Sequence, residues 1–130
     1  MLLIKTKIGP SSIHGIGLFA DEFIKKDTVV WRFNPTFDMR FDEAQLNTLP
    51  EVARKQFLNY AYLNPRMQKY VLCFDDCRFI NHSDNPTCLE VPSGGPEEGL
   101  DIAARDIEKG EELTCDYGSF DALFKEKMKV

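Results

Sequence analysis

The sequence of 130 residues has no long apolar run, no excess of basic residues and no closely paired cysteines. No stretch approaches the ~20 apolar residues that a membrane helix needs, so we expect no membrane association. The first residues, Met1 to Lys5, mix polar and apolar types too soon for the core of a signal peptide. These absences predict a soluble, intracellular protein.

The charge balance is acidic. Lys and Arg number 16 and Asp and Glu number 21, which gives a formal net charge of −5. Nucleic-acid binding depends largely on basic residues that contact phosphates, so we expect no direct nucleic-acid partner. An acidic domain suits a basic protein or peptide as its partner. The same excess of acid also fits a role in solubility alone, and charge leaves both interpretations open.

The four cysteines, Cys73, Cys77, Cys88 and Cys115, contain no C-x-x-C pair, and the two histidines do not complete a zinc spacing. In an intracellular protein, such cysteines are expected to be free and mostly buried thiols. We therefore predict no metal site.

A chain of this length can bury one modest core, and it shows no repeat or linker. Alternating and β-branched patterns predict several short strands. The expected strands cover residues 2–8, 18–20, 28–33, 70–74, 87–91, 100–104 and 112–115. The sequence therefore predicts a mainly β fold.

The middle of the chain has a different character, which predicts one helical insertion. Asp42 and Gln45 have the spacing of a capping box, and Thr48 and Glu51 repeat it. Apolar residues then recur at helical spacing and predict an amphipathic helix over residues 51–63, which a following proline ends.

Three short motifs are weak signals when each is taken alone. Gly15 and Gly17 in a turn indicate positive φ angles or tight packing, although they also allow a ligand to approach bare backbone. His82, within Asn81-His82-Ser83, fits either a hydrogen-bonded structural histidine or a catalytic base. Tyr117 comes at an expected strand end, where a hydroxyl could orient an amine.

In combination, the motifs are far more specific. Their order and spacing resemble those of the SET domains of protein-lysine methyltransferases, over roughly residues 3–118. Four segments carry the resemblance: residues 15–20, 78–83 (Arg-Phe-Ile-Asn-His-Ser), 104–112 and 116–118 (Asp-Tyr-Gly). We accordingly divide the chain into a SET domain, residues 1–118, and a short, helical C-terminal tail, residues 119–130, packed on it.

The resemblance implies a β-clip fold of small sheets, with a pseudoknot in which residues 116–117 thread under a loop. It implies S-adenosyl-L-methionine on one face and a substrate lysine entering from the other. By motif position, backbone groups of Ile16 and Gly17 meet the cofactor, and Asn81 and His82 hold its adenine and amino-acid portions. Tyr117 borders the cofactor and matches the family's catalytic tyrosine.

The sequence departs from the family after the last motif, where many relatives carry a cysteine-rich zinc segment and this tail has no cysteine. Phe120 or Phe124 could cover the site instead, or a second subunit of a homodimer could complete it. Simple core packing of the two phenylalanines is the alternative. We also expect Asp121 to cap a short helix that contains Phe124 and Met128.

The substrate channel also differs from that of the family. Glu90 stands eight residues after His82, where some relatives have a channel tyrosine, and Phe33 stands at a first-strand position that is often tyrosine. With Tyr62, they are our candidate channel residues. The expected activity is methylation of lysine side chains in a histone-like or other basic protein. The alternative is a non-catalytic module of the same fold that binds peptide or cofactor.

Overall fold

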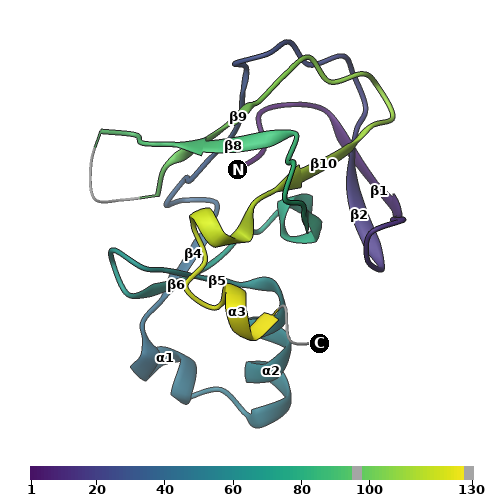
Figure 1. Ribbon diagram of the computed structural model, residues 1–130. Helices are drawn as coiled ribbons and strands as arrows, with labels where there is room; N and C mark the ends of the chain where they lie inside the picture. The colour runs from purple at the N-terminus through teal and green to yellow at the C-terminus, as the bar shows by residue number, and fades with distance from the viewer. Residues whose placement is uncertain (95–97, 128–130) are drawn as a thin grey trace.

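The computed structural model describes residues 1–94 and 98–127. Short strands form three small sheets in this part of the chain, and two helices are inserted between strands of the third sheet. Figure 1 shows the sheets in the upper and middle parts of the molecule and the two helices at its lower end. The predicted mainly β fold with one helical insertion is confirmed.

The first sheet brings distant parts of the chain together, in the order β1 (Thr6–Pro10), β2 (Ile16–Ala20), β10 (Glu112–Cys115) and β7 (Asn81–His82). Strand β10 lies in the middle, antiparallel to β2 and parallel to β7. The threading expected of a pseudoknot stays a prediction.

The second sheet has the order β3 (Val29–Arg32), β9 (Leu100–Ala103) and β8 (Cys88–Val91), with antiparallel neighbours. The first strand expected, residues 2–8, is partly wrong because β1 begins only at Thr6. The start of the chain instead lies along β3, where the Leu3 amide donates to the Val30 carbonyl at 3.0 Å and Leu2 forms a bridge with Trp31.

The third sheet consists of β4 (Met39–Phe41), β6 (Lys69–Leu72) and β5 (Tyr62–Asn64), with helices α1 (Glu43–Asn47) and α2 (Glu51–Tyr60) between β4 and β5. The sequence patterns had not indicated β4 or β5. The helix expected over residues 51–63 is three residues too long. Ala61 adopts an extended conformation, with ψ of 158°, and the next three residues pair with β6.

The two expected capping boxes have different outcomes. The box of Asp42 and Gln45 is confirmed, with both reciprocal hydrogen bonds present. The box of Thr48 and Glu51 is wrong: Thr48 ends α1, where its hydroxyl donates to the Gln45 carbonyl, and Pro50 precedes α2 without a side-chain cap.

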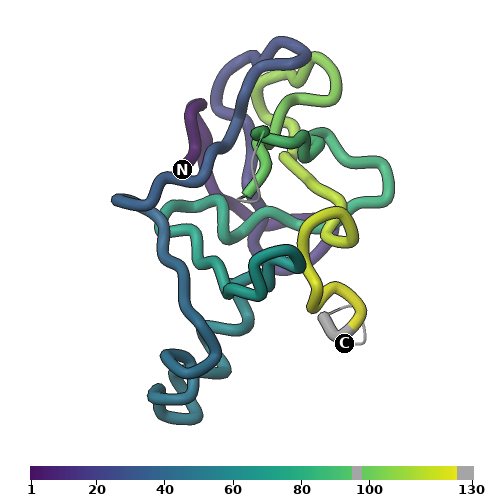
Figure 2. The backbone as a smooth tube through the Cα atoms, turned by 90° about the vertical axis from the view of Figure 1, so that its left-hand side faces the viewer, coloured from purple at the N-terminus to yellow at the C-terminus, as the bar shows by residue number. Residues whose placement is uncertain are grey.

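Two clusters of buried side chains form the core. The larger one lies between the first and second sheets and includes Leu18, Trp31 and Leu113, while the smaller one joins the helices to the third sheet through Leu46 and Phe57. The helices therefore pack on their own small core at one end of the molecule (Figure 2). All four cysteines are buried and free, as predicted.

The chain after β10 consists of two short helical segments, η2 (Tyr117–Ser119) and α3 (Phe124–Lys127). Asp121 precedes α3 and accepts a hydrogen bond from the Leu123 amide at 2.9 Å. Met128, expected in this helix, lies outside the described residues. The described helices are all too short or too polar to cross a membrane.

Candidate active site

The central strand β10 joins the separate motifs into one region. Its register places Leu113 opposite Leu18 of β2, Thr114 opposite Asn81 and Cys115 opposite His82. Tyr117 follows directly in η2. The turn at Gly15 that leads into β2 and Gly17 (the glycine turn) therefore adjoins the Asn-His-Ser and Asp-Tyr-Gly motifs, because β2 and β7 both pair with β10.

The side chain of Asn81 is buried and holds the turn that leads into β2. Its amide nitrogen lies 3.1 Å from the His14 carbonyl, 3.3 Å from the Ile16 carbonyl and 3.2 Å from a carboxylate oxygen of Glu112. These contacts engage the amide nitrogen within the protein. Asn81 therefore fixes the backbone of the glycine turn.

Gly17 is needed where the turn meets β10. A Cβ atom there would lie 2.9 Å from Cδ of Glu112 and 3.0 Å from Cβ of Ser11, closer than real Cβ contacts. Ile16, next to it, is half exposed. Gly17 itself is buried, and no larger residue can occupy its position without a shift of Glu112, whereas the turn before it, residues 12–16, is exposed.

His82 is fixed from both ring nitrogens. Its Nδ1 accepts the backbone N–H of Tyr117 at 3.1 Å, and its Nε2 lies 3.0 Å from Oδ1 of Asp84. Because Nδ1 is an acceptor, the proton belongs on Nε2 and points to Asp84. His82 thus positions the backbone of Tyr117. The His82 ring also packs against the ring of Phe124, with centroids 5.1 Å apart.

The hydroxyl of Tyr117 donates a short hydrogen bond to the Ile80 carbonyl. Burial raises the pKa of this hydroxyl well above its usual range, with further contributions from Cys115 and Asp121. Tyr117 therefore stays protonated at neutral pH, and it can orient a substrate amine but cannot remove its proton.

A cavity of about 410 Å³ lies beside Tyr117. Of the candidate site residues, it is lined by Tyr62, Glu90 and Tyr117, while Ile16, Gly17, Asn81 and His82 do not line it. The candidates therefore form two groups that meet at Tyr117. The rest of the wall includes two basic residues, Arg66 and Arg78, together with Trp31, Cys73, Cys77, Ile80, Glu98, Asp101, Cys115 and Phe120.

Phe33 is not among the residues that line this cavity. Its ring lies under the guanidinium of Arg40, 3.7 Å from ring centroid to Cζ, and borders a second, more polar hollow. A channel role for Phe33 stays a prediction, whereas its packing in this structure supports Arg40.

The C-terminal tail closes one side of the cavity. The ring of Phe120 packs edge-on against Tyr62 and Tyr117, with centroids 5.1 and 5.9 Å apart. The buried carboxylate of Asp121 accepts the Leu63 amide at 3.1 Å, which ties the tail to β5. Both phenylalanines of the tail therefore contact site residues. No second subunit is needed for these contacts.

The sequence patterns had not singled out two acidic residues of the cavity wall, Glu98 and Asp101. Asp101 interrupts the apolar strand β9, a signal that was visible in the sequence, whereas Glu98 belongs to no motif. Within residues 1–94 and 98–127, no group of three or more His, Cys, Asp or Glu side chains could hold a metal ion.

The comparisons with known proteins agree with this geometry. The SET domain family matches residues 15–118. Human histone-lysine N-methyltransferase 2D is 31% identical over 109 residues, which cover 82% of this chain and 2% of that protein. The histone-lysine N-methyltransferase of Schizosaccharomyces pombe described as specific for H3 lysine 4 is 35% identical over 118 residues, covering 84% of this chain and 12% of that protein.

A solved structure shares the fold. A candidate histone methyltransferase of Plasmodium falciparum superposes with a TM-score of 0.62 at 23% identity, covering 90% of this chain and 96% of that one. The chain spans only a small part of the two curated relatives named above. The family match covers most of the residues and all the motifs around Tyr117, and the chain therefore belongs to the SET-domain family of protein-lysine methyltransferases.

Proposed function

We propose that this chain methylates lysine side chains of a basic protein with S-adenosyl-L-methionine as the methyl donor. The observation that carries the proposal is the position of Tyr117. Its backbone is held by His82 and its hydroxyl by the Ile80 carbonyl, and the residue lines the cavity.

The residues around the glycine turn fit the methyl donor. The exposed turn that ends at Ile16 suits close approach of a ligand, with the buried Gly17 directly behind it, and the ring of Phe124 beside His82 offers a flat apolar surface for an adenine. We assign these residues and Asn81 to its binding, with Asn81 acting through the turn that it fixes. The bound donor supplies an electrophilic methyl group on a positively charged sulfur.

The cavity fits the lysine. Tyr62, Phe120 and Tyr117 present aromatic surface to an alkyl chain. Lysine is an ammonium ion at neutral pH, and only the neutral amine has the lone pair that attacks; with a pKa of about 10.4, deprotonation costs about 4.6 kcal/mol at pH 7. Burial disfavours the charged amine, and Tyr117 holds the nitrogen in line with the methyl group.

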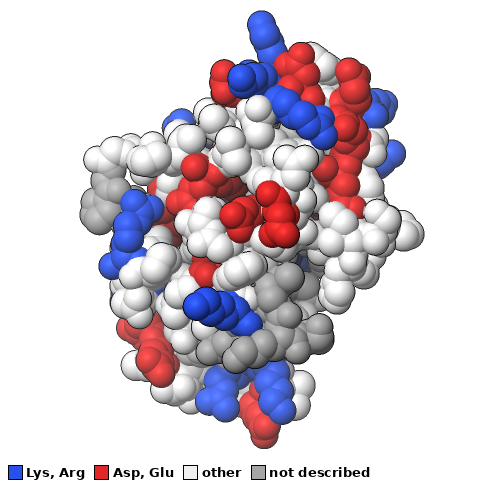
Figure 3. Space-filling view, in the orientation of Figure 1, with Lys and Arg blue, Asp and Glu red and all other residues white. Residues whose placement is uncertain are grey.

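We place the substrate among histone-like or other basic proteins. Both relatives are histone-lysine N-methyltransferases by name. Acidic side chains gather in the middle of the face shown in Figure 3, with most Lys and Arg toward its edges, which suits a basic segment lying across it. Action inside the cell is part of the proposal, because all four thiols are free.

Substitution of Tyr117 tests the proposal. We expect Tyr117→Phe to lower transfer of radiolabelled methyl from S-adenosyl-L-methionine to histones or a mixed lysate by about 100-fold or more, because the amine loses its orienting hydroxyl. Tyr70→Phe is the matched control: Tyr70 packs against the smaller core cluster and does not line the cavity, so activity should stay near that of the unsubstituted protein.

The alternative function has a distinct result. A non-catalytic module would bind S-adenosyl-L-methionine or peptide in calorimetry and transfer no label to any substrate. Light scattering on the active protein checks the homodimer. A monomer with full activity would show that the tail alone completes the site.

A further inference from the structure

Three residues form one row across the second sheet. Trp31 of β3 is the partner of Asp101 in β9, and Asp101 is in turn the partner of Glu90 in β8. Directly opposed residues on neighbouring strands project from the same face of a sheet. All three line the cavity beside Tyr117, so one wall of this cavity is a continuous polar row.

The two ends of this row are incompletely satisfied. In the described part of the chain, two buried side-chain polar atoms have no hydrogen-bond partner, Nε1 of Trp31 and Oε2 of Glu90. Trp31 is only 4% exposed. Unpaired buried polar atoms are costly and uncommon. Their occurrence together on one cavity wall points to a ligand that donates to Glu90 and enters with water, which can accept from Trp31.

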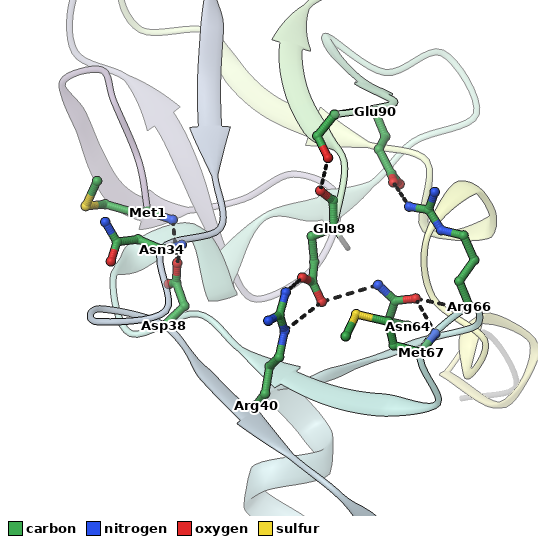
Figure 4. A network of polar contacts seen from close by, with 10 residues as sticks. Met1, Asn34, Asp38, Arg40, Asn64, Arg66, Met67, Glu90 and Glu98 are labelled. Atoms are coloured by element: carbon green, nitrogen blue, oxygen red, sulfur yellow. Dashed lines mark hydrogen bonds and ion pairs between the residues drawn. The ribbon is translucent and has the colours of Figure 1, made fainter. Parts of the chain in front are cut away.

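Two further carboxylates line the cavity, and both are already engaged. Asp121 accepts the amides of Leu63 and Leu123. Glu98 forms an ion pair with Arg40 and accepts a hydrogen bond from the Asn64 amide at 3.2 Å, so it is already satisfied (Figure 4). Glu90 meets Arg66 only through Oε1, at 3.7 Å. In the described part of the chain, the side chain of Asp101 has no hydrogen bond or ion pair. The acceptors left for a ligand are therefore Asp101 and one oxygen of Glu90.

The shape and charge of the site select the ligand. Two carboxylates suit a cation with several N–H donors, and the aromatic wall of Tyr62 and Phe120 suits an alkyl stem. A lysine ammonium has both features. The indole N–H of Trp31, next in the row, is a donor available to the carboxylates or to a water that enters with the substrate.

The charge state of Asp101 suits proton transfer. Burial, and then the charge of Glu90, raise the pKa of Asp101 to about 7, against a smaller opposing effect of the Met1 amino group. Burial also raises the pKa of Glu90, which Arg66 opposes. The other titratable groups whose pKa values the Asp101 charge raises are Tyr62, Cys77, Cys88 and Cys115.

We infer that Asp101, paired with Glu90, receives the ammonium end of the substrate lysine and takes up its proton before methyl transfer; this rests on the proposed function. The N–H bond breaks, the nitrogen keeps the electron pair, and the proton forms an O–H bond on the carboxylate. The methylated product carries its own positive charge as it leaves, and the carboxyl group returns its proton to solvent. Tyr117, which stays protonated, orients the amine for the attack.

Peptide binding tests the ammonium site independently of catalysis. Calorimetry would compare a basic peptide containing lysine with the same peptide carrying norleucine, which keeps the alkyl stem and lacks the nitrogen. We expect Asp101→Asn to lower the affinity for the lysine peptide about 10- to 100-fold and to change the affinity for the norleucine peptide less than about twofold. Glu43→Gln, an exposed carboxylate on α1, should leave both affinities unchanged.

The pH profile tests the proton transfer. In single-turnover reactions with saturating peptide, the rate of the unsubstituted protein should rise as Asp101 ionises near pH 7. Asp101→Asn should lose this step and recover activity only toward pH 9 to 10, where the lysine loses its proton to solvent. A residue with a merely structural role would lower the rate equally at every pH.

The outcomes separate the two proposals. If the unsubstituted protein transfers no methyl group, the proposed function fails, and the peptide comparison alone decides the ammonium site. If Asp101→Asn and the unsubstituted protein showed the same ratio of affinities for the lysine and norleucine peptides, the inference would be overturned. Lost discrimination with an unchanged pH profile would overturn the proton transfer. Should Asp101→Asn fail to fold, Asp101→Ser, which also removes the carboxylate, is measured in the same way with the same criteria.

Discussion

At the scale of single residues, the carboxylate of Glu112 organises the turn before β2. It accepts the Ser11 hydroxyl at 2.7 Å, lies 3.2 Å from the Asn81 amide nitrogen, and occupies the space where Gly17 has no side chain. One carboxylate on the central strand thus connects the glycine turn to the Asn-His-Ser motif. The backbone at Gly17 is fixed by contacts made before any ligand binds.

Gly17→Ala should therefore damage both stability and cofactor binding. The added methyl group must displace Glu112, and we expect the free energy of unfolding to fall by about 1 to 3 kcal/mol, the usual cost of overpacking. Urea unfolding checks the stability, and calorimetry with S-adenosyl-L-methionine checks the affinity.

Gly9→Ala is the matched control for that change. A Cβ atom at Gly9 would meet only the ring of Phe19, at 3.8 Å, an ordinary contact. Alanine there should leave stability within about 1 kcal/mol. If both variants lost equal stability, the contact with Glu112 would not be the reason that position 17 is glycine.

The residues of the site differ in how far their sequence patterns predicted them. Gly17, Asn81, His82 and Tyr117 occur in short motifs that the sequence shows directly, although their contacts join segments that are distant in the chain. Asp101 belongs to no motif. It enters the site only because β9 pairs with both β3 and β8, and strand pairing between distant segments cannot be read from one strand's pattern.

At the scale of elements, the C-terminal tail is held by one carboxylate. Asp121 is buried and accepts the amides of Leu63 and Leu123 at 3.1 and 2.9 Å, while the Ala122 amide donates to the Leu63 carbonyl at 2.9 Å. These hydrogen bonds hold Phe120 against Tyr62 and Tyr117. A short tail without cysteine can therefore close one side of the cavity.

Asp121→Ala should release this tail. Two backbone amides lose their acceptor, and we expect a loss of about 1 to 3 kcal/mol in the free energy of unfolding. Limited proteolysis should cleave the tail faster, and methyl transfer should fall with it. Asp121→Asn keeps an acceptor oxygen and should restore most of the stability; equal losses in both variants would contradict the hydrogen-bond explanation.

The helical insertion shows why element boundaries were harder to predict than element types. The capping box at Asp42 is local chemistry and was predicted correctly. The end of α2 depends on Tyr62 to Asn64 pairing with β6, a contact that overrides the helical pattern of the sequence. Strand β4 was missed for the same reason, because its three residues are stabilised by pairing with β6.

At the scale of the whole molecule, the cavity lies between parts that come from all three sheets. Trp31, Glu90 and Asp101 belong to the second sheet, Tyr62 to the third, and Cys115 to the first. The fold therefore buries carboxylates at a junction of sheets, where an apolar core would be more stable. This cost is measurable because it depends on pH.

Asp101→Asn should stabilise the protein at high pH and not at low pH. Folding raises the pKa of Asp101 from 3.8 to about 7, so between these values the folded state keeps a proton that the unfolded chain has lost. The stability from this proton is complete below pH ~4 and is lost as pH rises through about 7. A shift of about three units at about 1.4 kcal/mol each sets an upper limit of about 4 kcal/mol for the gain of Asp101→Asn at pH 8.

Urea unfolding at several values between pH 4 and pH 8.5 measures this gain as the difference in free energy between the variant and the unsubstituted protein. Groups common to both proteins largely cancel in that difference, so its rise across the neutral range reports Asp101. Glu43→Gln removes an exposed carboxylate and should give a nearly flat difference. A flat difference for Asp101→Asn as well would mean that the Asp101 carboxylate is solvated in the folded protein, and it would remove the physical basis for its uptake of a proton from lysine.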